Sequence, residues 1–149
     1  MRVKDCMTKQ VITVGGSEPV SVAARLMARH NVGMLPVRSA QGGLDGIVTD
    51  RDILVRCVAA DKSPRALRVR EVMSGHVVAA APETDAGEAA RMMAREQVRR
   101  LPVVAQGTLV GMVTLADLCR RPDYAMEAAE ALEQICAGVR RLDSDVEDF

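Results

Sequence analysis

The chain of 149 residues repeats itself, and this repeat constrains its fold more than any other feature. Four blocks return in the same order, three of them 66 residues later and the last one 65 residues later. The paired blocks are Val3–Thr8 and Val69–Ser74, Ala23–Arg29 and Ala89–Arg95, Leu35–Val37 and Leu101–Val103, and Gly46–Ile53 and Gly111–Leu118. The lost residue falls in the Gly-rich stretch 39–45, where a loop tolerates deletion. Each copy is too small for a comfortable core of its own, so two copies that pack together are predicted.

Both copies show the same order of elements: strand, helix, strand, strand, helix. In the first copy we expect them at 11–14, 21–30, 35–38, 44–49 and 50–60. In the second copy we expect them at 77–80, 85–96, 101–104, 109–114 and 115–121. The short apolar runs favour strands, whereas the three- and four-residue spacing of Ala, Leu and Met favours helices. The fold class predicted is therefore α/β (α+β), with two β-α-β-β-α repeats related by pseudo-twofold symmetry.

The boundaries follow from the same alignment. The first repeat is predicted at 1–60, a polar linker with a proline at 61–68, and the second repeat at 69–121. A C-terminal helix and an acidic tail are predicted at 122–149. The helix has an apolar stripe of Ala125, Ala129, Leu132, Cys136 and Val139.

Composition excludes several classes of function. Positive and negative charges cancel, and the aromatic residues are one Tyr and one Phe, so neither an electrostatic field for DNA nor a base-stacking platform is expected. The four cysteines form no CxxC pair and there are two histidines, so we expect no metal site and no catalytic residue. No apolar h-region or membrane-length apolar run is present, and a cytoplasmic protein with reduced thiols is predicted.

The blocks Leu-Pro-Val and Gly-Ile-Val-Thr-x-x-Asp-Ile, with a Val-x-x-x-Met-Thr lead-in, resemble the tandem CBS domain, or Bateman module. The resemblance covers about residues 3–121. Asp50–Leu54 and Val98–Val103 especially resemble small stand-alone bacterial CBS-pair proteins. The resemblance implies a regulatory protein that is not an enzyme, requires no cofactor, and binds AMP, ADP, ATP or S-adenosylmethionine in clefts between the repeats. It also implies dimerisation, and some family members have no known ligand.

Two Thr-x-x-Asp motifs stand at the predicted strand-to-helix junctions. They are Thr49 with Asp52 and Thr114 with Asp117. A capping box explains this spacing without any ligand. The resemblance instead assigns the ribose to Asp52 and Asp117 and the phosphate to Thr49 and Thr114. It places Ile12 and Val78 beside the adenine.

Three arginines complete the predicted site. Arg99 and Arg100 stand where the first repeat has Gly33 and Met34. The resemblance assigns a phosphate contact to Arg100 first and to Arg99 second, although two arginines before a buried strand also suit a solvated edge. Arg51 is a further phosphate candidate, and the asymmetry leaves open whether one or two sites are occupied.

Two functions remain open for a chain with these features. The first is a nucleotide sensor that signals by conformational change to an unidentified regulated protein. The second is a ligand-free interaction module or stress-response structural module. The helix 53–60 is apolar on more than one face, so a homodimer that covers it is expected. The alternative is that the terminal helix folds back over it within one chain.

Overall fold

The computed structural model describes the backbone of residues 1–144 and the side chains of residues 1–138. The chain forms two compact units, each with its own apolar core. The first-repeat unit comprises residues 10–77 and 104–109. The second-repeat unit comprises residues 1–9, 78–103 and the chain from residue 110 onward.

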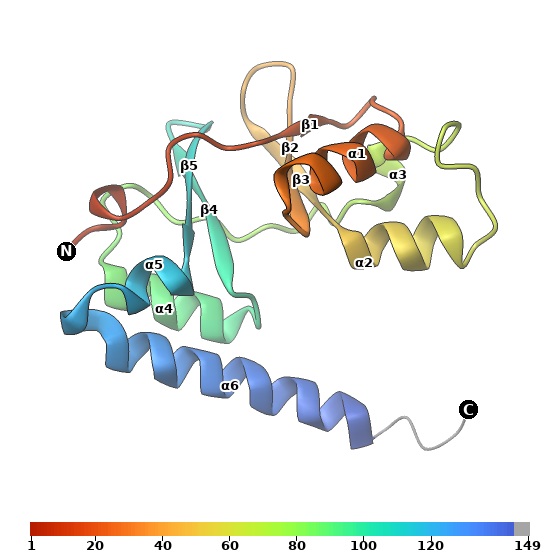
Figure 1. The fold of residues 1–149 in the computed structure, drawn as a ribbon. Coiled ribbons are helices and arrows are strands. Elements are labelled where there is room, and N and C mark those ends of the chain that lie inside the picture. The colour runs from red at the N-terminus through yellow and green to blue at the C-terminus, as the bar shows by residue number, and fades with distance from the viewer. Residues whose placement is uncertain (145–149) are drawn as a thin grey trace. The chain divides into compact units, whose positions relative to one another are not determined.

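The first-repeat unit is a three-stranded sheet with helices (Figure 1). Its elements are β1 (Val14–Gly15), α1 (Val20–His30), β2 (Met34–Arg38), β3 (Leu44–Thr49), α2 (Asp50–Ile53), the π-helical segment η2 (Leu54–Val58) and α3 (Val69–Val72). Strand β1 runs parallel to β2, and β2 pairs antiparallel with β3. Val20, Val37, Val48 and Val69 are fully buried in its core.

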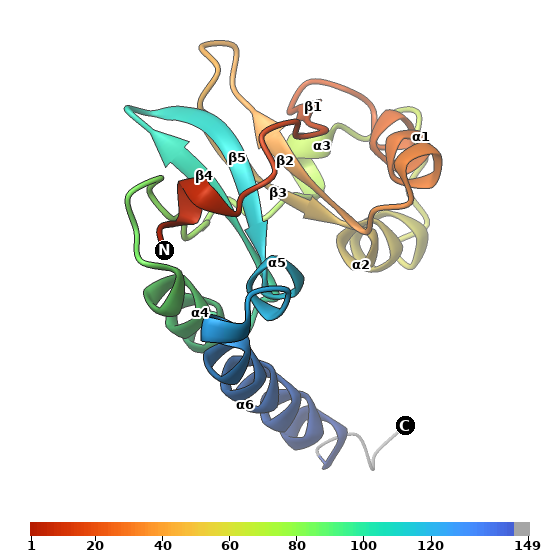
Figure 2. The same cartoon turned by 60° about the vertical axis from the view of Figure 1, so that its left-hand side comes forward.

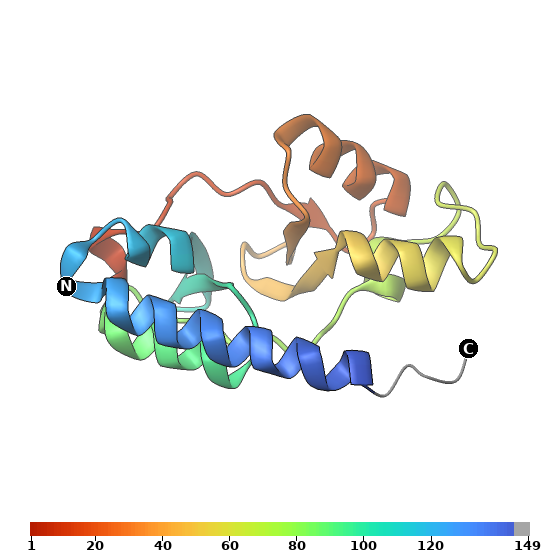
Figure 3. The same ribbon diagram turned by 60° about the horizontal axis from the view of Figure 1, so that its bottom comes forward.

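The second-repeat unit has a similar order of elements around a two-stranded sheet and adds a helix. Apart from residues 104–109 of the β4–β5 hairpin, which cluster with the other unit, its elements are η1 (Val3–Asp5), α4 (Ala86–Arg95), β4 (Arg100–Ala105), β5 (Thr108–Thr114), α5 (Leu115–Cys119), η3 (Pro122–Tyr124) and α6 (Ala125–Ser144). Ala80 bridges Val103 in parallel, as Val14 pairs with Val37 in the first-repeat unit. Helix α6 packs along α4 and α5 (Figures 1, 2 and 3).

The two lead-in blocks, Val3–Thr8 and Val69–Ser74, form the short helices η1 and α3, which the sequence did not predict. In the second-repeat unit, the Lys4 N–H donates to Pro82 O at 2.9 Å; in the first-repeat unit, the Arg70 N–H donates to Gly16 O at 2.9 Å. Each lead-in helix is followed by a methionine that needs a glycine opposite it. A Cβ on Gly46 would stand 2.8 Å from Met73 Sδ, and one on Gly111 would stand 2.7 Å from Met7 Sδ.

The predicted fold class, with two repeats and a C-terminal helix, is confirmed, but several element bounds differ. The strand expected at 11–14 is limited to Val14–Gly15, and that at 77–80 to a bridge at Ala80, because only these residues lie opposite the following strand. The helix expected at 50–60 changes at Leu54 into η2, where the Ala59 N–H donates to Leu54 O at 2.8 Å across the wider π turn.

The terminal helix buries a different face from its predicted apolar stripe. Its buried residues are Ala128, Ala131 and Ile135, which pack into the core of the second-repeat unit. Ala129, Leu132 and Cys136 of the stripe are exposed, and Val139 lies outside the described side chains. This helix therefore covers α4 and α5 and keeps a second, apolar face exposed.

Candidate functional site

The first Thr-x-x-Asp motif lies where β3 meets α2. Thr49 Oγ1 accepts from the Asp52 N–H at 3.1 Å, and Asp52 Oδ2 accepts from the Thr49 N–H at 2.9 Å. These bonds form the complete capping box. They use one carboxylate oxygen of Asp52, whose side chain is 16% exposed. The other oxygen of Asp52, Oδ1, lies 3.9 Å from Arg56 Nη1.

The second motif repeats this geometry where β5 meets α5. Asp117 Oδ2 accepts from the Thr114 N–H at 2.9 Å and from the Thr114 hydroxyl at 2.7 Å. Its Oδ1 lies 3.4 Å from Nη1 of the exposed Arg120. In both repeats the cap and a ligand would use different carboxylate oxygens. The capping interpretation and the ligand interpretation are therefore compatible.

The phosphate candidates differ between the repeats. The Leu115 N–H donates to Arg99 O at 3.0 Å, which brings the backbone of Arg99 beside Thr114. Arg99 and Arg100 are exposed and form no ion pair with any side chain in residues 1–138. In the first repeat, the Asp50 N–H donates to Gly33 O at 3.0 Å. A Cβ on Gly33 would stand 2.9 Å from an Asp50 carboxylate oxygen, so an acid occupies this place instead of a base.

The remaining predicted residues also divide between the units. Ile12 is half-buried against the first-repeat core, two residues before β1. Val78 is half-buried in the second-repeat unit, two residues before the bridge at Ala80. Arg51 is exposed on α2, and its backbone N–H donates to Asp50 Oδ1 at 2.8 Å. The first-repeat unit thus contains Ile12, Thr49, Arg51 and Asp52, and the second-repeat unit contains Val78, Arg99, Arg100, Thr114 and Asp117.

Sequence reasoning missed Arg56. Its Nη1 donates to Val72 O at 2.7 Å and to Met73 O at 3.2 Å, which ties η2 to the end of α3. Its four-residue spacing from Asp52 was a signal for their proximity. The contact with the α3 carbonyls depends on tertiary packing, so no local pattern indicates it.

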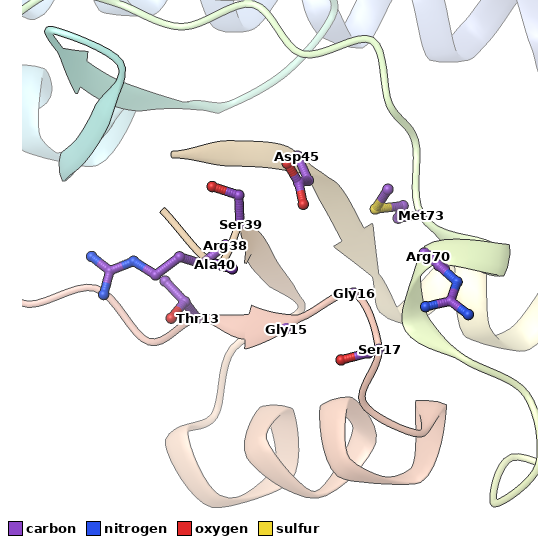
Figure 4. Close-up of a pocket in the computed structure, with 10 residues that line it drawn as sticks. All are labelled: Thr13, Gly15, Gly16, Ser17, Arg38, Ser39, Ala40, Asp45, Arg70 and Met73. Atoms are coloured by element: carbon purple, nitrogen blue, oxygen red, sulfur yellow. The ribbon is translucent and has the colours of Figure 1, made fainter. Parts of the chain in front are cut away.

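A second unpredicted feature is a pocket of about 580 Å³ in the first-repeat unit (Figure 4). It lies toward the start of β3, at Asp45, whereas Thr49 ends that strand. Its polar lining includes Thr13, Ser17, Arg38, Ser39, Asp45 and Arg70. The Thr-x-x-Asp residues do not line it.

The thiols and the acidic residues supply no evident reactive centre in the described part of the chain. Burial, assisted by the nearby Asp117 and Asp5 charges, raises the pKa of the Cys6 thiol, which disfavours its thiolate. Among residues whose side chains the structure describes, no three His, Cys, Asp or Glu side chains are grouped as metal ligands. Within the same limits, none of the helices has both the length and the apolar character needed to cross a membrane.

Comparison with known proteins identifies the repeats. The CBS domain family matches residues 3–58 and again residues 69–124. The CBS domain-containing protein YhcV of Bacillus subtilis is 44% identical over 133 residues, covering 89% of this chain and 94% of its own.

Two solved structures extend the comparison. A crystal structure of Hypoxic Response Protein I with two coordinated zinc ions has a TM-score of 0.76 and 33% identity, covering 81% of this chain and 98% of its own. The CBS domain pair of protein MJ0100, in complex with 5′-methylthioadenosine and S-adenosylmethionine, has a TM-score of 0.71 and 30% identity, covering 80% of this chain and 94% of its own. The chain belongs to the CBS domain family, as a tandem CBS pair.

Proposed function

We propose that this CBS pair is a regulatory module that binds an adenosine-type ligand, namely AMP, ADP, ATP or S-adenosylmethionine. The observation that carries the proposal is the doubled Thr-x-x-Asp junction, in which a fixed, largely covered carboxylate keeps one oxygen free of the cap. Such an oxygen can accept both hydroxyls of a ribose diol. The adenosine-type ligands bound to the CBS pair of MJ0100 support the same class.

The proposed roles follow from the free atoms of each residue. Asp52 and Asp117 bind the ribose through Oδ1. Thr49 Oγ1 accepts from the Asp52 N–H, so its hydroxyl proton is free to donate to a phosphate oxygen, whereas the Thr114 hydroxyl already donates to Asp117.

The other roles are assigned by residue type and position. Arg100 binds phosphate, with Arg99 and Arg51 as secondary cations, because all three are exposed guanidinium groups near the junctions. Ile12 and Val78 supply apolar contact for the adenine. We divide the chain into repeats at 1–60 and 69–121, the linker 61–68 and the C-terminal part 122–149.

We further propose that the protein acts as a homodimer, without catalytic activity, in the cytoplasm. The exposed fractions of Leu54, Val55 and Val58 on η2 are 59, 51 and 58%. The equivalent residues of the second repeat are Cys119, Arg120 and Asp123, which are also exposed and mostly polar. An apolar surface present in one repeat alone favours a contact with a second copy.

Light scattering tests the dimer. We expect a mass near twice 16.0 kDa for the wild type and a mass near 16.0 kDa for Leu54→Glu. A wild-type mass of a single chain at micromolar concentration would refute the dimer. Cys119→Glu is the matched control, since it adds the same charge at the equivalent place of the other repeat.

The same exposed surface favours a second candidate function, a ligand-free interaction module. A thermal-shift screen with AMP, ADP, ATP, NAD and S-adenosylmethionine separates the two. Ligand at about 100 times its Kd stabilises a fold by roughly 2.7 kcal/mol, so a rise of several degrees in Tm is expected. No shift with any adenosine ligand at millimolar concentration would eliminate the sensor and leave the interaction module.

A further inference from the structure

The second-repeat unit contains a small ion-pair cluster whose first-repeat counterpart is incomplete. The Glu83 carboxylate accepts from Lys4 Nζ at 2.7 Å and also from Arg2 Nη1. The equivalent residues in the first repeat are Ser17, Arg70 and Arg68. Both cations thus have a counterpart, and the carboxylate has none.

Backbone geometry supports this equivalence. The Val3 N–H donates to Thr84 O at 2.8 Å, and the equivalent Val69 N–H donates to Glu18 O at 2.9 Å. Arg2 bridges Asp85 in the same way as Arg68 bridges Pro19. The two lead-ins therefore present their cations to matching places in their own units.

The first-repeat cations are available for a ligand. Arg68 Nη1 donates to Ser17 O at 3.3 Å, and neither Arg68 nor Arg70 forms an ion pair with any side chain the structure describes. Glu18 follows Ser17, but its carboxylate forms no ion pair with Arg68 or Arg70. Glu18 does not complete the cluster either.

Two residues of the incomplete cluster, Ser17 and Arg70, line the pocket of Figure 4, whereas Arg68 is not part of its lining. Arg70 and Ser17 lie at one end of this pocket beside Gly16, and Arg38 lies with Thr13 at the other end. The equivalents of Thr13, Arg38 and Asp45 in the second repeat are the apolar residues Ala79, Val104 and Val110. A volume of about 580 Å³ is in the range of small-molecule sites. The polar side chains at Thr13, Arg38 and Asp45 are thus a property of the first repeat alone.

We propose that this pocket binds a small oxyanion, a carboxylate or a phosphate group, in the place that the Glu83 carboxylate occupies in the other repeat. Arg70 supplies the charge, and the Ser17 hydroxyl supplies a further donor. Guanidinium groups match planar or tetrahedral oxyanions through paired N–H bonds. The site uses none of the Thr-x-x-Asp residues, so it stands independently of the nucleotide proposal.

Amide NMR of the full chain tests the site directly. Sodium phosphate and sodium acetate are titrated separately, at an ionic strength held constant with sodium chloride. We expect saturable shifts of the Gly16, Ser17 and Arg70 amides with at least one of the two anions, and the stronger response identifies the anion type. Absence of saturable shifts at these amides with both anions would overturn the proposal.

Two arginine variants separate a site from general surface charge. Arg70→Ala should weaken binding roughly tenfold, the loss expected for a charge-assisted hydrogen bond. Arg25→Ala is the control, because Arg25 is an exposed arginine of the same unit on α1 and does not line the pocket. Equal weakening by both variants would show nonspecific charge attraction and contradict the site.

An exchange between the repeats gives the sharpest test. Ser17→Glu supplies the missing carboxylate and should abolish the anion response, while Glu83→Ser should create a response at the Lys4 amide. A Ser17→Glu variant that still binds the anion as the wild type does would contradict the proposal. So would a response that appears in Glu18→Gln and not in the wild type, because Glu18 would then be the native occupant.

Discussion

The two repeats share one backbone plan but differ in the chemistry they present around it. Both close the strand-to-helix junction with the same capping box, at Thr49 and at Thr114. They differ beside that junction. In the first repeat the Asp50 carboxylate lies next to Gly33, and in the second repeat the position equivalent to Gly33 is Arg99. The positions that build the fold are therefore duplicated, and the positions around them differ in charge.

The same division holds at the helices that close the repeats. Helix α5 packs against α6 and contributes to the core of the second-repeat unit, whereas Leu54 on η2 is 59% exposed. Each Asp has an arginine near its Oδ1, but Arg56 also donates to the carbonyls at the end of α3, whereas the side chain of Arg120 is 77% exposed. The first repeat thus leaves its closing helix exposed, whereas the second repeat covers its own with α6.

The largest expected effect is a difference in core packing. Leu118 is fully buried, and its counterpart Ile53 is partly buried. Leu118→Ala should lower the free energy of unfolding by about 2–5 kcal/mol, and Ile53→Ala by roughly half of that, because truncation costs most where packing is complete. Urea denaturation measures both. Equal losses would show that α6 adds no packing to α5.

The sequence alone allows much of this comparison to be predicted. The four repeated blocks indicate the order of elements, and the Thr-x-x-Asp spacing indicates both capping boxes. The bounds predicted for the short parallel strands are too long, because the length of such a strand depends on how many of its residues pair with the neighbouring strand. Contacts such as Arg56 with the α3 carbonyls and Glu83 with Lys4 join residues far apart in sequence, so no periodicity reveals them.

The glycines opposite the lead-in methionines should be equally important in both repeats. Gly46→Ala and Gly111→Ala each place a Cβ within 3 Å of a methionine sulfur and a backbone oxygen. Each variant should lose about 1–3 kcal/mol of unfolding free energy through overpacking. Gly75→Ala, with no atom within 4 Å of its Cβ, is the control. A large loss in one repeat alone would break the equivalence of the two lead-ins.

A smaller effect is expected for the arginines of the second repeat. If Arg100 binds phosphate, Arg100→Ala should weaken ATP roughly tenfold and leave adenosine nearly unchanged. Calorimetric titration of both ligands measures this, with Arg29→Ala as an exposed control in the first repeat. Equal losses for ATP and adenosine would show that Arg100 acts through the structure.

The smallest effect is a pH dependence confined to the second repeat. Hydrogen bonds from Lys4, and then from Arg2, hold the pKa of Glu83 below its ordinary value. A lowered folded pKa gives stability that is present above the unfolded pKa and lost as the pH falls through the folded one. The difference in unfolding free energy between wild type and Glu83→Gln should therefore be constant above about pH 5.5 and vanish in stronger acid. A difference that is unchanged at about pH 3 would show that the ion pairs do not stabilise the unit.

The most direct test of the account is calorimetric titration of an adenosine ligand into wild type, Asp52→Asn and Asp117→Asn. Asn keeps an oxygen acceptor for the cap and removes the charge that we assign to the ribose contact. We predict binding to the wild type and a loss of about 1.5–3 kcal/mol of affinity in at least one variant, with Tm close to that of the wild type. Wild-type affinity in both variants, or no binding of any adenosine ligand to the wild type, would contradict the account.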